Sequence, residues 1–277
     1  MANGEQNSEA RPRLAIAIVN WNGGTMLDEC IACLLRQTLS PSRILVIDNG
    51  STDGSAQRIR QTPGIEVRLT GSNHGFAKAN NLAMQECGTE FVALINPDAF
   101  PDEDWLERLI GAASRHPDVA AFGSRQMMHG ASNLLDGVGD VYHFSGLIWR
   151  DGHGRVYSQA DDIDGEIFSP CAGAALYRRD ALLKVGGFDE DYFCYVEDVD
   201  LGFRLRLAGY KAMYVASSVV HHVGSATTGG KHSDFAVYHG HRNLVWAFVK
   251  NMPGALFWML LPAHVLLNVV TLIHFAL

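Results

Sequence analysis

Short apolar runs alternate with segments of helical periodicity along the first part of the chain. The apolar runs are rich in β-branched residues and predict strands at 14–21, 43–48, 65–69 and 91–96. The segments between and after them predict four helices. The first ends near residue 37, the next two cover 53–61 and 76–87, and the last ends near residue 116. Strands that alternate with helices indicate an α/β fold with a mostly parallel sheet, flanked by helices and joined by right-handed crossovers.

The pattern is less regular in the second half. Residues 125–170 are rich in Gly, Asp and aromatic residues and predict long loops. Residues 171–188 predict a strand and a short helix, which is followed by another helix that ends near Gly209. Residues 211–224 predict a final strand, and a helical tail starts near residue 233.

The C-terminal segment 253–277 is nearly free of charge. Pro262 and three polar residues interrupt it, which makes it a poor uninterrupted membrane span. The aromatic residues and Lys250 near its start suit a membrane interface instead. We therefore expect C-terminal helices that associate with a membrane surface. Packing against the protein's own core or a second subunit is the alternative.

Composition narrows the possible classes of protein. Apolar residues make up 47% of the chain, enough for a sizeable core, and the formal net charge of −8 argues against a nucleic-acid partner. The polar residues 1–13 predict a flexible tail without a signal peptide. Cys30 and Cys33 have metal-pair spacing but lie inside a predicted helix, so we interpret them as buried thiols of a protein in a reducing, cytosolic setting.

Candidate binding residues follow the predicted strands. In open α/β sheets, ligands bind beyond the carboxyl ends of the strands. Asp48 ends the second strand and is either part of a turn or a carboxylate that accepts hydrogen bonds from a ribose or base. Asn96 and Asp98 follow the fourth strand and form either a turn with a helix cap or an oxygen ligand for Mg²⁺ or Mn²⁺, which would also hold substrate phosphates.

Adjacent histidines end the last predicted strand. Strand alternation directs the rings of His221 and His222 to opposite faces of the sheet. A lone histidine here favours a structural role, whereas a histidine beside a metal-binding carboxylate favours a ligand.

Three carboxylates gather within four positions in the stretch FCYVEDVDLGFR (193–204). Acids in a first helical turn are favoured by the helix dipole, and Asp200 has the spacing for an ordinary helix pair with Arg204. For Asp198 a catalytic role is compatible with that explanation, because a helix start is a rigid place for a general base. The sequence does not decide between Glu197 and Asp198 as the base.

Several catalytic templates are missing. The chain has no G-x-S-x-G motif and no strict G-x-G-x-x-G after the first strand, and the P-loop-like segment 224–232 has the wrong spacing. These absences argue against a hydrolase triad, a P-loop nucleotide site and a dinucleotide dehydrogenase.

Eight motifs occur in one order and together resemble the inverting family 2 glycosyltransferases of the GT-A fold, most closely a bacterial rhamnosyltransferase-like branch. They are IVNWNGG (18–24), VIDNGSTDGS (46–55), NHGFAKANN (73–81), INPDAFPDEDWL (95–106), CAGAALYRRDAL (171–182), GGFDEDYFCYVEDVDLGFRLRLAGY (186–210), HHVGSAT (221–227) and HRNLVW (241–246).

The resemblance assigns roles to these residues. The nucleotide-sugar would be held by Val19, Trp21, Asp48, Asn73, Asn81 and Asn96. Asp98 matches the last acid of the family's metal-binding D-x-D motif, in which Asn96 replaces the first acid, and His222 would complete the metal site. Asp198 matches the catalytic base, with Glu197 beside it.

The resemblance also implies an activity and an organisation. It implies transfer of a sugar, best L-rhamnose from dTDP-L-rhamnose, to a glycan or polyprenyl-diphosphate-linked acceptor of the bacterial cell envelope, with Mg²⁺ or Mn²⁺. Residues 14–125 would form the nucleotide-sugar-binding half, 126–232 the acceptor-binding and catalytic half, and 233–277 the membrane-associating tail on the inner face of the cytoplasmic membrane. A homodimer is compatible with this organisation.

Two other classes remain open. A nucleotidyltransferase has a similar architecture, but the loop after its first strand should carry Arg and Lys for a triphosphate, and residues 21–29 contain neither. A non-catalytic nucleotide-sugar-binding protein would not need the carboxylates at 197 and 198.

Overall fold

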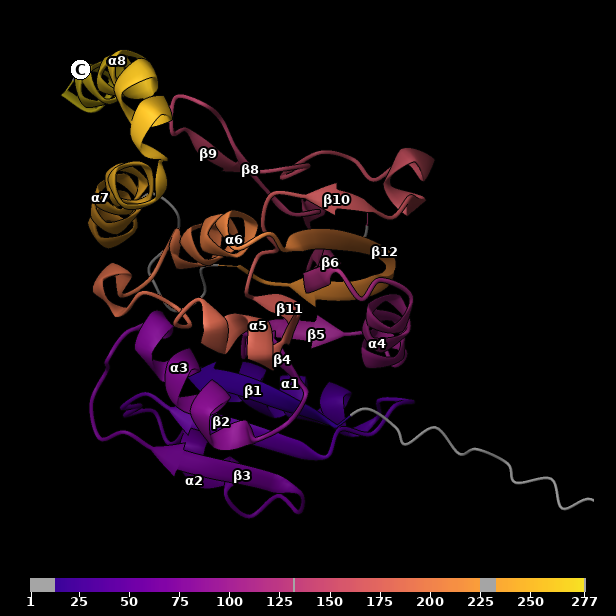
Figure 1. Ribbon diagram of the computed structural model, residues 1–277. Helices are drawn as coiled ribbons and strands as arrows, with labels where there is room; N and C mark the ends of the chain where they lie inside the picture. The colour runs from indigo at the N-terminus through magenta and orange to yellow at the C-terminus, as the bar shows by residue number, and fades with distance from the viewer. Residues whose placement is uncertain (1–12, 132, 225–232, 277) are drawn as a thin grey trace, which may run out of the picture.

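A computed structural model describes residues 13–131, 133–224 and 233–276. One mixed sheet runs through the protein, with helices on both of its faces (Figure 1). Its strands are β1 (Leu14–Asn20), β2 (Arg43–Asp48), β3 (Ile65–Leu69), β4 (Phe91–Ile95), β5 (Ala99–Pro101), β6 (Val119–Met128), β7 (Leu135–Gly137), β10 (Gly165–Ile167), β11 (Ala174–Arg178) and β12 (Lys211–His222). The helices are α1 (Gly24–Leu35), α2 (Ser55–Ile59), α3 (Phe76–Cys87), α4 (Trp105–Arg115), α5 (Arg179–Lys184), α6 (Glu197–Leu207), α7 (Asp234–Asn251) and α8 (Gly254–Ala276). The flexible tail predicted for residues 1–13 lies almost entirely outside the described residues.

The N-terminal half of the sheet is parallel and confirms the predicted α/β class. The strand order is β10-β12-β6-β11-β4-β1-β2-β3, in which β1 pairs in parallel with β2 and β4, and β2 pairs in parallel with β3. β11 is antiparallel to both of its neighbours, β4 and β6. The sheet is therefore mixed rather than uniformly parallel.

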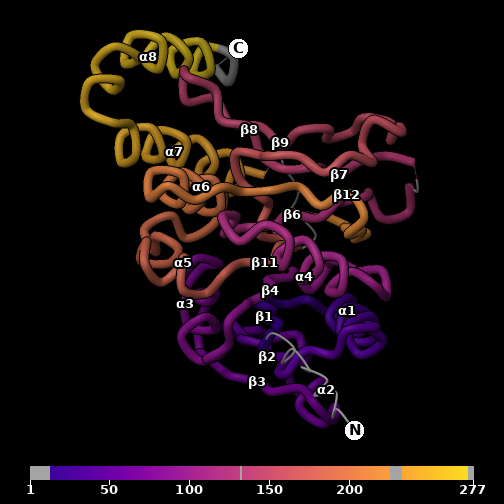
Figure 2. The backbone as a smooth tube through the Cα atoms, turned by 45° about the vertical axis from the view of Figure 1, so that its right-hand side comes forward, coloured from indigo at the N-terminus to yellow at the C-terminus, as the bar shows by residue number. Residues whose placement is uncertain are grey.

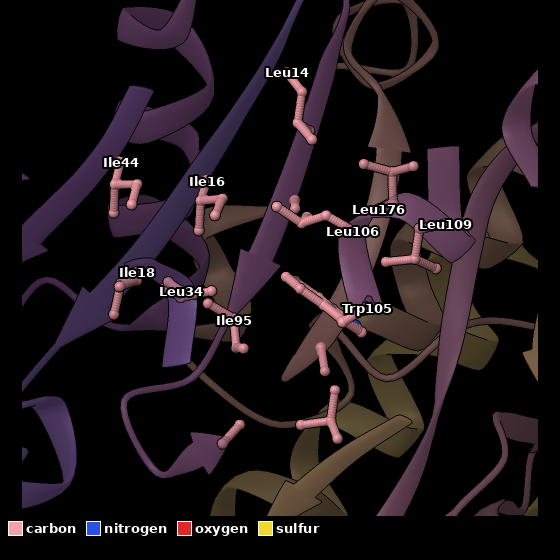
Figure 3. Packing of buried hydrophobic residues seen from close by; sticks show 14 of the residues in the cluster. Leu14, Ile16, Ile18, Leu34, Ile44, Ile95, Trp105, Leu106, Leu109 and Leu176 are labelled. Carbon is pink, nitrogen blue, oxygen red and sulfur yellow. The ribbon is translucent and has the colours of Figure 1, made fainter. Parts of the chain in front are cut away.

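Both faces of the central strands are buried, which explains why they read as continuous apolar runs. Leu14, Ile16 and Ile18 of β1 point toward α1 and α4, where they share one hydrophobic core with Trp105 (Figure 3). The intervening residues Ala15, Ala17 and Val19 pack into a second core with α3, α5 and α6. The two cores fix the positions of the strand ends that carry the candidate site.

The prediction of long loops at 125–170 is wrong. β6 continues to Met128 and crosses residue 125, where the sequence suggested a boundary between two halves. Four strands of three residues follow: β7, β8 (Asp140–Tyr142), β9 (Ile148–Arg150) and β10. Strands this short contain too few residues to show an alternating pattern, so hydrophobic periodicity could not predict them.

The C-terminal tail consists of two helices at the end of the molecule remote from β3 (Figures 1 and 2). Helix α8 is continuous through Pro262. Its stretch Gly254–Ile273 has a mean hydropathy of 2.0, and 6% of that window is buried. By length and composition alone this helix could cross a membrane.

Candidate active site

The carboxyl ends of β1 and β2 form a buried polar cluster around Asn20. Asn20 is directly opposite Asp48 in the parallel ladder, and its Nδ2 lies 2.9 Å from Asp48 Oδ1. The same amide group is 3.0 Å from Ser51 Oγ and 2.9 Å from Ser55 Oγ. Asp48 is 5% exposed, so this network fixes the carboxylate in one orientation.

The two residues that flank Asn20 lie in different environments. The side chain of Val19 belongs to the core formed with α3, whereas Trp21 is half-buried beyond the strand end. Of these two predicted nucleotide-binding residues, Trp21 is thus the one with a side chain partly open to solvent.

Two further asparagines predicted for the nucleotide-sugar pocket hold loops together. Asn73 Oδ1 accepts hydrogen bonds from Asn49 Nδ2 and from the Gly75 backbone N–H, both at 2.9 Å. Asn81 uses both ends of its amide on Phe188, donating to the carbonyl oxygen and accepting from the N–H at 2.8 Å each. Asn81 therefore ties α3 to the loop that precedes the acidic stretch.

The predicted metal ligands come together at the end of β4. β12 pairs with β5 so that His222 is opposite Ala99, which places His222 Nε2 3.4 Å from Asp98 Oδ1. As expected from strand alternation, His221 points to the other face, where it is half-buried and 3.4 Å from Asp102. Asn96, by contrast, is bound through its backbone to Gly173 and Ala99.

His222 is held between two carboxylates. Its Nδ1 lies 2.8 Å from Asp136 Oδ2, while its buried Nε2 makes no hydrogen bond of good geometry among the described residues. Burial disfavours the charged imidazole, but Asp136 and Asp98 outweigh that effect and raise the pKa of His222 to about 9.

Asp98 and His222 fit a divalent cation only if a bound substrate supplies further donor atoms. The described part of the chain contains no group of three His, Cys, Asp or Glu side chains arranged to hold a metal ion. Asp98 and the Nε2 atom of His222 offer two donors, and substrate phosphates would have to supply others. His222 must lose its second proton before it can ligate, so metal binding here would release a proton.

Arg150 pairs with this cluster through Asp136 and acts on Asp198 of α6 through its charge. Its Nη1 lies 2.9 Å from Asp136 Oδ2, its Nε 3.8 Å from Asp140 Oδ1, and its Nη2 2.7 Å from Cys171 Sγ. Burial and, to a smaller extent, the Asp198 carboxylate raise the pKa of Asp140 to about 8, although Arg150 opposes both effects.

Asp198 is the more accessible of the two adjacent acids. It is half-buried, and its carboxylate accepts hydrogen bonds from the backbone N–H groups of Ala172 (3.2 Å) and Val199 (2.9 Å). Burial raises the pKa of Asp198, whereas Arg150 lowers it. Glu197 is 6% exposed, its Oε2 lacks a partner among the described residues, and burial together with Asp198 raises its pKa well above the usual range. These environments favour an ionised Asp198 beside a protonated Glu197.

The loop before these acids has an unusual backbone. Phe193, Tyr195 and Val196 all have positive φ angles, of 66°, 66° and 69°. Residues other than glycine pay a steric penalty in this region, and a β-branched valine most of all.

Asn243 of α7 holds that strained loop in place. It is fully buried, and its Nδ2 lies 2.7–3.0 Å from the carbonyl oxygens of Tyr192, Cys194 and Tyr195. The neighbouring Arg242 donates to the carbonyl oxygens of Asp191 and Tyr192. Helix α7 thus supplies the hydrogen-bond donors that the loop's own backbone cannot provide.

Asp200 forms the predicted pair with Arg204, at 2.6 Å, but the pair is not an ordinary surface interaction. Asp200 is 1% exposed and also accepts hydrogen bonds from Tyr192 Oη and Asn251 Nδ2. It therefore joins α6, the strained loop and α7, which is a structural role.

Sequence reasoning missed five residues that shape the site: Asn20, Asp136, Asp140, Arg150 and Asn243. Asn243 lies in the motif HRNLVW, and Asn20 lies inside IVNWNGG, so a signal existed for both. The other three lie in the segment that was interpreted as loops. Residues 225–227 of the motif HHVGSAT lie outside the described residues.

Comparisons with known proteins agree with this architecture. The family model for glycosyl transferase family 2 matches residues 15–186, which is more than half of the chain. The chain is 31% identical over 255 residues to the N-acetylglucosaminyl-diphospho-decaprenol L-rhamnosyltransferase of Mycobacterium tuberculosis, covering 82% of this chain and 81% of that protein. It is 26% identical over 219 residues to the O-antigen chain rhamnosyltransferase RfbN of Salmonella typhimurium, covering 76% of this chain and 66% of RfbN.

Solved structures show the same fold at low sequence identity. GalNAc-T7 with UDP, GalNAc and Mn²⁺ superposes with a TM-score of 0.69 at 15% identity, covering 86% of this chain and 48% of that one. The mannosyltransferase PcManGT of Pyrobaculum calidifontis, in complex with GDP-Man and Mn²⁺, gives 0.61 at 19% identity, covering 92% and 69%.

The chain therefore belongs to glycosyl transferase family 2 and is a glycosyltransferase of the GT-A fold. Among its relatives are rhamnosyltransferases, as the motifs predicted.

Replacing Asn243 with Leu should destabilise the protein by about 1–3 kcal/mol, because buried carbonyl oxygens of the strained loop would lose their donor. The measurement is urea-induced unfolding followed by circular dichroism. Asn80→Leu is the matched control, since Asn80 is equally buried but donates only to a carbonyl of its own helix. Equal losses in the two variants would show that the loop does not depend on Asn243.

Proposed function

We propose that this protein is an inverting glycosyltransferase that moves L-rhamnose from dTDP-L-rhamnose to a polyprenyl-diphosphate-linked saccharide. The observation that carries the proposal is the line of charged groups from Asp98 and His222, through Arg150, to Asp198. In this line, Asp98 and His222 would lie beside the diphosphate of the donor, and Asp198 would serve as the proton acceptor. The choice of sugar and acceptor is supported by the name of the mycobacterial relative.

Each part of the site has a task in an in-line displacement. An acceptor hydroxyl attacks the anomeric carbon of the donor sugar, and Asp198 takes the hydroxyl proton as the new C–O bond forms. The bond from the anomeric carbon to the diphosphate oxygen breaks on the opposite side, and that oxygen keeps the electron pair. One displacement inverts the anomeric centre and needs no second carboxylate as nucleophile.

The leaving diphosphate would lie at the end of β4. Asp98 and His222 would hold Mg²⁺ or Mn²⁺ there, and such an ion supplies positive charge for the departing diphosphate. The polar cluster around Asn20 and Asp48 would bind the nucleoside, with Trp21 beside it. The tail would bring the site to the inner face of the cytoplasmic membrane, where a lipid-linked acceptor is found.

A donor screen tests the reaction class. The protein is incubated with dTDP-L-rhamnose or with UDP- and GDP-sugars, with N-acetylglucosaminyl-diphospho-polyprenol as acceptor, and with or without Mg²⁺ or Mn²⁺. We expect release of dTDP and formation of a rhamnosylated lipid, with a strong loss of both on chelation. Release of pyrophosphate from a nucleoside triphosphate and a sugar phosphate would indicate a nucleotidyltransferase instead, and binding without release would indicate a non-catalytic protein.

Asp198→Asn should reduce kcat by at least about 10²-fold while the Kd for dTDP, measured calorimetrically, stays close to that of the parent protein, because the amide cannot take the proton. Asp191→Asn is the control, since Asp191 is an exposed acid of the same loop. Near-normal turnover in Asp198→Asn, together with a large loss in Glu197→Gln, would assign the base to Glu197.

Arg150→Gln should shift the acidic limb of the pH profile of kcat/KM to higher pH. Arg150 lowers the pKa of Asp198, so its removal raises that pKa, and the base is then protonated over more of the acidic range. Activity relative to the parent protein should therefore fall most at low pH. Arg155→Gln is the control, because Arg155 pairs with Asp161 away from the site. An unchanged acidic limb would remove Arg150 from this role.

A further inference from the structure

Helix α8 carries its apolar side chains on the outside of the molecule. Nine large apolar residues on it are 43–72% exposed: Leu256, Trp258, Met259, Val265, Leu266, Val269, Val270, Leu272 and Ile273. At about 100° per residue they cover an arc of roughly 200° around the helix. The polar residues His264, Asn268 and Thr271 fall on the remaining side, and His264 is only 3% exposed. This distribution is the reverse of that expected for a surface helix in water.

The hairpin formed by β8 and β9 presents a second exposed apolar group. Phe144 and Leu147 at its tip and Trp149 on β9 are 56%, 40% and 42% exposed. The segment 141–149 contains no Asp, Glu, Lys or Arg. A solvated hairpin tip usually carries polar residues, so this composition points to an apolar environment.

The hairpin tip and α8 are packed against each other. His264 Nδ1 lies 2.8 Å from the carbonyl oxygen of Ser145, and the His264 ring stacks on Phe248 with centroids 4.0 Å apart. A Cβ on Gly146 would lie 2.5 Å from His264 Nδ1, so the turn has no space for a larger residue. Both views of the backbone show the hairpin reaching α8 at the end of the molecule away from β3 (Figures 1 and 2).

We propose that α8 and the tip of the β8–β9 hairpin form one surface that enters the interfacial region of a lipid bilayer. This inference deepens the proposed function and rests on it only for the identity of the acceptor. A second copy of the chain would cover one stripe of α8, whereas lipid can cover the whole exposed arc together with the separate hairpin tip.

The same hairpin links this apolar surface to the charged residues of the candidate active site. Asp140 and Arg150 are cross-strand partners at the base of the hairpin, where they belong to the charged line that leads to Asp198. Each strand is three residues long, which corresponds to about 10 Å. Insertion of the tip would therefore place the charged base of the hairpin about one strand length from the lipid, within reach of a saccharide on a lipid diphosphate.

Flotation with vesicles of phosphatidylglycerol and phosphatidylethanolamine tests this surface in the full chain. The triple variant Phe144→Ser, Leu147→Ser, Trp149→Ser should lower the vesicle-bound fraction about tenfold or more, because three apolar contacts with lipid are lost. The matched control is Leu35→Ser, Leu69→Ser, Leu183→Ser, which removes residues of 51%, 46% and 45% exposure from elsewhere on the protein. The control should float like the parent chain.

Two outcomes would overturn the inference. One is equal flotation of the hairpin variant and the parent chain. The other is a parent chain that does not float but sediments as a dimer, which the hairpin substitutions dissociate; the surface would then be an interface between two copies. Flotation uses neither donor nor acceptor, so a failure of sugar transfer in the donor screen leaves its result unchanged.

Discussion

The site depends on one half-buried cation, the guanidinium of Arg150. Around it lie the carboxylates of Asp136 and Asp140, and beyond them are Asp198 and the His222 imidazole. Like charges at this spacing would repel strongly in a poorly solvated region, and a buried charge is tolerated only when it is paired. Arg150 provides that pairing for Asp136 and for Asp140. It allows the proposed metal ligands, Asp98 and His222, and the proposed base, Asp198, to coexist within one cluster of charges.

The proposed base, Asp198, depends equally on elements far away in the sequence. Three residues with positive φ angles precede α6, and Asn243 of α7 donates to the carbonyl oxygens of Tyr192, Cys194 and Tyr195 in the same loop. Asn251 and Asp200 make a second tie between α7 and α6. Helix α7 also leads directly into α8. The apolar tail and the strained loop before α6 are therefore parts of one packed unit, which gives the tail a structural role in addition to any contact with lipid.

The parallel half of the fold could be predicted from the sequence because its strands are buried on both faces and its helices are amphipathic. The sequence predicts Asp48, Asp98 and Asp198 as candidate site residues because each ends or follows a strand or starts a helix within a recognisable motif. Asp136, Asp140 and Arg150 could not be found in this way. They lie on three-residue strands or beside them, and such strands show no period that distinguishes them from loops.

The sequence by itself determined the family, the alternation of strands and helices in the parallel half, and the types of side chain at the strand ends. These features depend on local patterns and on motifs that are continuous along the chain. Only the tertiary structure decided which carboxylate is accessible, which asparagines serve the loops, and which cation balances the acids. Those properties arise from burial and from contacts such as Arg150 with Asp136 or Asn243 with Tyr195. Neither burial nor a contact between residues far apart in the chain can be inferred from the local sequence.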